Sequence, residues 1–187
     1  MGYATWEPKE SQVREALTLQ GILVQVLRTV GLEEDTKSSH EEDGDGLSPH
    51  AAWAMWLPRE TARRAKLIAF TFLHTHSVAY NIYPVLRSNE LRIRLPCSTK
   101  EWKAASAAQW MVARRETGKE QLDFQQALAL LLRNSDGTAP LDPLPTPLGN
   151  YVLLHGLLQR IHIVRDLSLP IMDQTASLPN EEVCKLE

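Results

Sequence analysis

The sequence predicts an all-α protein, an irregular helical bundle of five to six helices with one short extended segment. Three observations lead to this prediction. Apolar residues recur at helical spacing in several segments, helix-capping residues precede them, and only a short segment alternates between apolar and polar residues. With 187 residues, of which 43% are hydrophobic, the chain is large enough to bury a core as a single domain over 1–187.

The first helix is expected from about Ser11 to Gly31, because glycine readily takes the left-handed conformation that ends a helix. Its apolar positions are Val13, Ala16, Leu17, Leu23, Val24, Leu27 and Val30, widened by Leu19, Ile22 and Val26. A face this wide predicts a well-buried helix. Residues 32–47 follow, and we interpret them as a disordered acidic linker because they are too polar and too charged to pack.

A short helix is expected to begin at Ser48-Pro49, a cap followed by a first-turn proline, and Pro58 either ends or kinks it. A long helix is then expected over residues 59–81. Its apolar positions are Ala62, Ala65, Ala69, Phe72, Leu73, His76 and Tyr80, with Leu67 and Phe70 thickening the face.

Residues 91–95 alternate, so three aliphatic side chains point one way and Arg92 and Arg94 the other. Pro84 and Pro96 bracket this segment, which argues against a central strand. We therefore expect an extended segment that lies over the helices.

The four residues Ser98 to Glu101 fit a capping box, in which each side chain bonds the backbone N–H of the other residue. One helix is expected from there to about Glu116. Asp123 and Gln126 are expected to cap the next helix. Its core positions would be Phe124, Ala127, Leu128 and Leu131.

Four prolines in residues 135–147 predict an extended linker, which leads to Thr146-Pro147, again a cap plus first-turn proline. The last helix is expected to end before Pro170, with a disordered tail over 171–187. Its repeating positions are Tyr151, Leu154, His155, Leu158, Ile161 and His162.

The net charge of −3 conceals an asymmetry along the chain. Residues 33–45 hold seven acids against one lysine, whereas residues 59–115 hold eleven Lys or Arg against three Glu. We interpret the basic stretch as a solvated helix face, in preference to a surface for nucleic acid or for the chain's own acidic segment. No membrane contact is expected, since neither a transmembrane run nor a signal peptide is visible.

No catalytic residue, cofactor site or metal site is predicted. His74 and His76 stand two apart, on roughly opposite sides of a helix, and His155 and His162 share a face without a carboxylate or Cys at ligand spacing. We interpret all four as core histidines. Cys97 is interpreted as a buried or idle thiol, and the tryptophans as core residues. With Cys184 as the second cysteine, neither a disulfide framework nor a zinc module can form, which favours a reducing intracellular compartment.

Four short motifs follow one another in an order that is characteristic of a family. Trp56 leads into Glu60-Thr-Ala-Arg63-Arg64; the extended segment ends in Leu95-Pro96-Cys97; Trp102 follows; and Leu-His155-Gly156-Leu lies in the last helix. Over roughly residues 12–166 the chain resembles the fungal-specific transcription factor domain, or middle homology region, of regulators whose DNA reader is a C2H2 zinc finger.

The resemblance implies a regulatory domain in a nuclear protein that controls transcription by RNA polymerase II. It implies protein partners in the transcription machinery, and zinc and DNA contact only through a finger module that this sequence lacks; a homodimer is left open. The motif residues are expected to be architectural, with Arg63 and Arg64 pairing with acids or helix carbonyls and Trp102 docking on the long helix. The alternatives are a helical interaction or scaffold protein unrelated to transcription, and a small helical enzyme or ligand carrier.

Overall fold

The computed structural model describes residues 9–34, 48–133 and 140–176, with side chains described as far as residue 168. In these ranges it contains six α-helices and no β-strand, which confirms the predicted all-α class. The helices are α2 (Glu10–Val30), α3 (Pro49–Tyr80), α4 (Thr99–Trp102), α5 (Ala107–Thr117), α6 (Phe124–Arg133) and α7 (Pro147–Ala176), with a 3-10 turn η1 (Ser88–Glu90).

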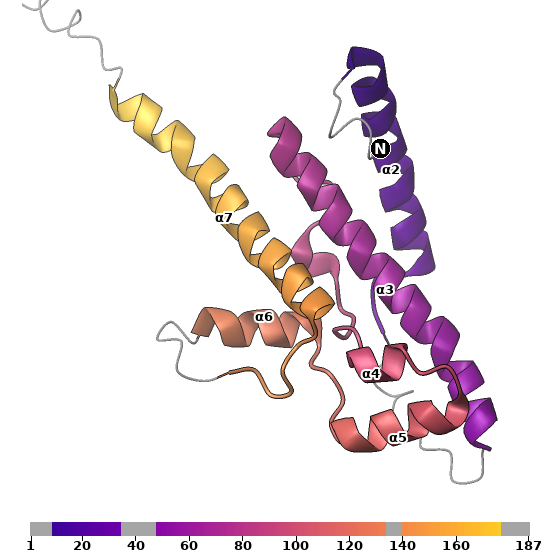
Figure 1. Cartoon of the computed structure of the whole chain (residues 1–187). Coiled ribbons are helices and arrows are strands. Elements are labelled where there is room, and N and C mark those ends of the chain that lie inside the picture. The colour runs from indigo at the N-terminus through magenta and orange to yellow at the C-terminus, as the bar shows by residue number, and fades with distance from the viewer. Residues whose placement is uncertain (1–8, 35–47, 134–139, 177–187) are drawn as a thin grey trace, which may run out of the picture.

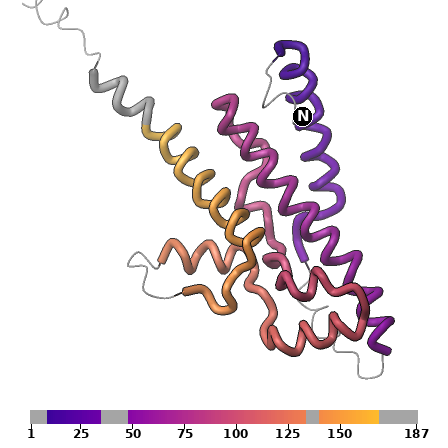
Figure 2. The backbone as a smooth tube through the Cα atoms, viewed as in Figure 1, coloured from indigo at the N-terminus to yellow at the C-terminus, as the bar shows by residue number. Residues whose placement is uncertain are grey.

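Helix α3 is the central element of the bundle (Figure 1). Helices α2 and α7 lie on either side of it, and α7 diverges from α3 toward its own C-terminal end (Figures 1 and 2). The short helices α4 and α5 lie near the N-terminal half of α3, and α6 crosses close to the start of α7. No helix in the described part of the chain is both long and apolar enough to cross a membrane.

The extended segment predicted at residues 91–95 runs through the middle of this arrangement. Leu91, Ile93 and Leu95 are fully buried in the main apolar core, as the alternation predicted. On one side the backbone of Arg92 exchanges hydrogen bonds with residues 32–34, and on the other the segment bonds the backbone of residues 122–124. These are isolated bridges and not a sheet. Through them the extended segment connects the start of α6 with the residues that follow α2.

Local capping signals position most helix ends as predicted. Gly31 ends α2 with a positive φ of 93°, and Thr146 accepts a hydrogen bond from the third residue of its helix. Asp123 likewise accepts backbone N–H groups in the first turn of α6. Pro58 does not end the helix that begins after Ser48, because α3 continues unbroken across it.

The prediction of a single helix from Ser98 to Glu116 is wrong, because the structure has two helices there. Both hydrogen bonds of the capping box form, but the helix they start ends at Trp102. Ser106 then caps a second helix, and the Gln109 side chain accepts the N–H of Ala105 just before it. A second local cap thus outcompetes continuation of the first helix.

The predicted faces of α2 and α3 are also wrong in part. Buried positions of α2 are Ala16, Gln20, Val24 and Leu27, whereas Leu17, Leu19, Ile22, Val26 and Val30 are exposed. Buried positions of α3 are Glu60, Leu67, Phe70, Thr71, Leu73, His74, His76 and Ser77, whereas Ala62 and Ala65 are exposed. Both helices carry apolar residues on more than one side. The periodicity of the sequence therefore could not show which side of each helix is buried.

Helix α7 departs most from its prediction. Tyr151, Leu154, Leu158 and Ile161 are exposed, and the buried residues are Gly149, Val152, Leu153, His155, Gly156 and Gln159. Gln159 faces inward because its amide accepts the N–H of Ser88 at 2.6 Å and donates to the carbonyl of Leu86 at 2.9 Å. Leu131 of α6, also predicted in the core, is about one third exposed.

The structure departs from the predicted linkers and tail at the boundaries of these segments. Leu32 is buried and residues 33–34 pair with the extended segment, while residues 35–47 lie outside the described residues. Leu141 is buried within the predicted 135–147 linker, of which residues 135–139 are not described. Helix α7 continues past Pro170 to Ala176, which corrects its predicted end; residues 177–187 of the predicted tail are not described.

Candidate functional site

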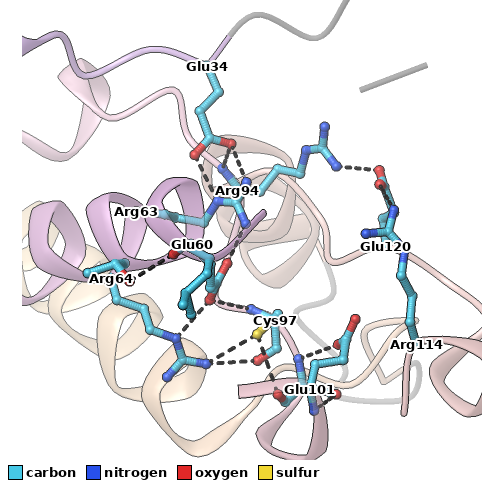
Figure 3. A network of polar contacts seen from close by, with 12 residues as sticks. Glu34, Glu60, Arg63, Arg64, Arg94, Cys97, Glu101, Arg114 and Glu120 are labelled. Carbon is cyan, nitrogen blue, oxygen red and sulfur yellow. Dashed lines mark hydrogen bonds and ion pairs between the residues drawn. The ribbon is translucent and has the colours of Figure 1, made fainter. Parts of the chain in front are cut away.

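Glu60 is fully buried in the first half of α3 and organises a cluster of charged groups (Figure 3). Arg63 and Arg64 follow at three and four residues, so all three side chains project from the same side of the helix. The distance from Arg63 Nη1 to Glu60 Oε2 is 2.5 Å, and that from Arg64 Nε to Glu60 Oε1 is 2.8 Å. Glu60 Oε1 also accepts the backbone N–H of Cys97 at 3.0 Å.

A second carboxylate completes the coordination of Arg63. Glu34, in the segment that follows α2, receives two bonds from this guanidinium, with Nε–Oε1 at 2.8 Å and Nη2–Oε2 at 3.1 Å. Burial disfavours the charged guanidinium, but the hydrogen bonds and charges of Glu34 and Glu60 more than offset this and raise the pKa of Arg63. The two acids therefore hold Arg63 as a permanent cation between α3 and the preceding segment.

Arg64 connects α3 to the end of the extended segment. Its Nη2 donates to the carbonyl oxygen of Cys97 at 3.2 Å, and its guanidinium lies 4.2 Å from the centre of the Trp102 ring. Leu95 and Pro96 are buried just before this point, so the chain is fixed where it turns into the Ser98 cap.

The Cys97 thiol is not suited to nucleophilic chemistry. Burial and the neighbouring Glu60 carboxylate raise its pKa to about 12, so the thiol stays protonated at neutral pH. It is a buried structural side chain, in agreement with the prediction from the sequence.

The tryptophans do not all have the core positions that were predicted for them. Trp110 of α5 is 3% exposed and contacts Trp56 of α3, with ring centres 5.3 Å apart. Trp102 is 38% exposed and meets α3 through the guanidinium of Arg64, so the predicted burial of Trp102 is wrong. Trp110 is the aromatic residue that locks α5 on α3. Its neighbours Gln109 and Val112 are largely exposed, and nothing in its spacing distinguished Trp110 from Trp102 beforehand.

Residues 4–180 match the profile of the fungal-specific transcription factor domain. The chain belongs to this family. No curated protein and no solved structure matches the chain significantly. The family match covers all four motifs that suggested the resemblance, and it indicates a role in the regulation of transcription.

A histidine pair in this transcription factor domain was missed by the sequence analysis. His74 of α3 and His155 of α7 meet with their Nδ1 atoms 2.9 Å apart, so one ring donates and the other accepts. Burial, with smaller contributions from His155 and His162, lowers the pKa of His74 to about 4; burial also lowers the pKa of His155. Both rings are therefore neutral at pH 7. Neither periodicity nor motif connects positions 81 residues apart.

The described histidines do not gather with other potential ligands into a group that could hold a metal ion. No group of three or more potential His, Cys, Asp or Glu ligands occurs among the residues described. His162 lies 3.3 Å from Asp166, one helical turn further, a carboxylate that the sequence analysis overlooked. Gly156 lies next to the pair and lets α7 approach α6, since a Cβ there would lie 2.9 Å from Phe124.

The basic stretch of the domain is extensively paired with acids. Apart from the cluster around Glu60, these pairs are Arg87 with Glu90, Arg92 with Glu33, Arg94 and Arg114 with Glu120, and Lys100 with Glu116. Together with Arg63 and Arg64, more than half of the eleven cations of residues 59–115 have carboxylate partners. Carboxylates of the same chain thus offset part of the positive charge of this region, and the pairs of Arg92 and Lys100 are largely exposed to solvent.

Proposed function

We propose that this domain regulates transcription by RNA polymerase II through contacts with other proteins, and that it neither reads DNA itself nor catalyses a reaction. The observation that carries the proposal is the pairing of the basic stretch with acids of the same chain. A surface that tracks phosphates needs cations that exchange counterions for phosphate, and cations held by carboxylates are poorly available for this.

The chemistry of the buried polar groups supports the proposal. The Cys97 thiol has a pKa of about 12, and the lowered pKa of His74 belongs to a ring that is 1% exposed. Neither group combines access to solvent with a pKa near neutrality, which general acid–base or nucleophilic catalysis requires. The charged cluster instead joins α3, the segment after α2 and the turn at Cys97.

A reporter assay in fungal cells tests the regulatory role. The chain is fused to an unrelated DNA-binding domain, and transcription of a reporter carrying the matching site is measured. We expect a change in reporter output, in either direction, compared with the DNA-binding domain alone. A disruptive variant of the cluster, Glu60→Ala, should abolish the change. A scaffold protein without a role in transcription would leave the reporter unaffected.

Direct DNA reading is tested with the purified chain. Fluorescence anisotropy with labelled duplex DNA at physiological salt should give no more than weak, salt-sensitive binding, with a dissociation constant above roughly 1 μM. Tight, sequence-dependent binding would contradict the proposal.

We further propose that DNA is read by a C2H2 finger module encoded together with this domain, and that the protein acts in the nucleus. The genomic sequence upstream of Met1 tests the first point, and fluorescence microscopy of the protein tagged at its own locus tests the second. An upstream coding sequence without Cys and His residues at Cys₂His₂ spacing would refute the finger module. A protein that stays outside the nucleus would refute nuclear action.

A further inference from the structure

A second pair of adjacent arginines, Arg114 and Arg115, lies in the last turn of α5. Unlike Arg63 and Arg64, this pair is loosely held. Arg114 meets Glu120 at 3.8 Å, and its side chain is 31% exposed. Arg115 is exposed and forms no ion pair with any residue that the structure describes. The two guanidinium groups are therefore available to carboxylates of another protein.

Thr117 follows this pair at the spacing that arginine-directed protein kinases select. Arg114 stands three residues before Thr117, and Arg115 stands two residues before it. Kinases of this class bind the substrate as an extended chain, and acidic side chains of the kinase pair with the two arginines. By contrast, Arg63 and Arg64 have no serine or threonine two or three residues further on.

The end of α5 can present Thr117 to such an enzyme. Thr117 is the last residue of the helix, Gly118 ends it with a positive φ of 64°, and the next helix begins only at Phe124. None of the four residues from Arg114 to Thr117 is buried. One turn of α5 can therefore open locally with little exposure of the core.

We propose that Thr117 is a phosphorylation site for an arginine-directed protein kinase, with ATP as the phosphate donor. Oγ1 of Thr117 attacks the γ-phosphorus, and a P–O bond forms as the bond from this phosphorus to the β,γ-bridging oxygen breaks. The hydroxyl proton passes to a base of the kinase, and ADP leaves with the bonding electron pair. The site does not depend on the function proposed above, because phosphate transfer is measured on the chain itself.

Phosphate at Thr117 changes the contact between α5 and α4, which lie close together (Figure 1). The hydroxyl donates to the Ala113 carbonyl at 2.9 Å and lies 3.3 Å from Oγ of Ser98, the residue that caps α4. The ester oxygen of a phosphothreonine has no proton to donate. A dianion at the C-terminal end of a helix, beside Glu116, is also repelled by the helix dipole and by that carboxylate. Phosphorylation therefore loosens the end of α5 from α4.

Incubation of the purified full chain with magnesium ATP and the catalytic subunit of cyclic-AMP-dependent protein kinase tests the site. This kinase selects arginines two and three residues before the acceptor. Mass spectrometry of proteolytic peptides should place phosphate on Thr117. Ser168 is the internal comparison, since it is exposed and follows Arg165 by three residues but has Asp166 in the second position. Phosphate on Ser168 should appear at least about tenfold more slowly, because one charge-assisted contact is missing.

Variants with a matched control test the role of the arginines. Arg115→Gln removes one guanidinium group without breaking a described ion pair, and it should slow phosphorylation of Thr117 at least about tenfold. Arg160→Gln, at an exposed arginine of α7, should leave the rate unchanged. Thr117→Ser should still accept phosphate at this position, and Thr117→Ala should not.

Thermal melting tests the effect on α5. Phosphorylation should lower the melting temperature of the wild-type chain by at least about 2 °C, and the same treatment should leave that of Thr117→Ala unchanged. A wild-type chain without phosphate on Thr117, or equal rates for Arg115→Gln and the wild-type chain, would overturn the assignment of the site. Phosphorylation of Thr117 without a change in melting would refute its link to the packing of α5 on α4.

Discussion

Among single residues, Glu60 is the buried carboxylate at the centre of the charged cluster on α3. It accepts hydrogen bonds from Arg63, Arg64 and the backbone of Cys97 while being fully buried. Glu60→Gln would leave two partly buried guanidinium groups without this anion. Breaking a buried ion pair from one side typically costs about 3–5 kcal/mol, and we expect a loss of unfolding free energy in this range by urea denaturation.

The control for Glu60→Gln is an ion pair of the same local geometry on the surface. Glu10 pairs with Arg14 one turn later on α2, but both side chains are more than three quarters exposed. Glu10→Gln should change the unfolding free energy by less than about 0.5 kcal/mol. If both variants lost the same amount, burial would not explain the contribution of Glu60.

The two tryptophans at α4 and α5 should differ in the same assay. Trp110→Ala removes a nearly buried ring and should destabilise the fold by about 3–5 kcal/mol, because it leaves a cavity. Trp102→Ala removes a half-exposed ring whose main described contact is the Arg64 guanidinium, so a loss of about 1 kcal/mol is expected. A larger loss of unfolding free energy in Trp102→Ala would support the role in the core that the sequence predicted for Trp102.

At the scale of helices, two glycines with opposite surroundings test how α6 and α7 pack. An alanine Cβ at Gly156 would lie 2.9 Å from the Phe124 ring, so Gly156→Ala forces the two helices apart and should cost about 1–3 kcal/mol. At Gly21 in α2 no atom lies within 4 Å of the added Cβ. Gly21→Ala should therefore stabilise the protein by up to about 1 kcal/mol through helix propensity. Thermal melting should shift in opposite directions for the two variants.

Several helix ends could be predicted from the sequence because their signals are local. A cap such as Thr146 or a terminating glycine such as Gly31 acts within one turn, where sequence neighbours are also spatial neighbours. The alternation of residues 91–95 was equally informative, since a fully buried set of three aliphatics fixes which side faces inward.

Helix faces and the pairing of distant groups could not be predicted in the same way. Gln159 and Glu60 are polar, yet both are buried because partners from other segments satisfy them. The contact of Glu34 with Arg63 and that of His74 with His155 arise only when the chain has folded. Of the charged cluster, the sequence indicated the pairing of the two arginines with acids but not which acids.

For the molecule as a whole, the histidine pair predicts loss of stability at acid pH. Folding lowers the pKa of His74 to about 4 and also lowers that of His155, compared with about 6.5 in the unfolded chain. As pH falls below about 6.5, the unfolded state therefore takes up protons that the folded state excludes. The contribution is fully present above this pH and is lost progressively toward pH 4, up to about 3 kcal/mol for His74.

Urea denaturation at a series of pH values measures this effect. His74→Gln should reduce the change in unfolding free energy between about pH 6.5 and pH 4, whatever its effect at neutral pH. His50→Gln, at an exposed position near the start of α3, should retain the wild-type change. His74 belongs to α3 and His155 to α7, and both helices contribute residues to the apolar core. Protonation of the pair should therefore separate the two helices, and the whole domain should unfold as one unit. An identical pH profile for His74→Gln and the wild-type chain would show that the pair does not control acid unfolding.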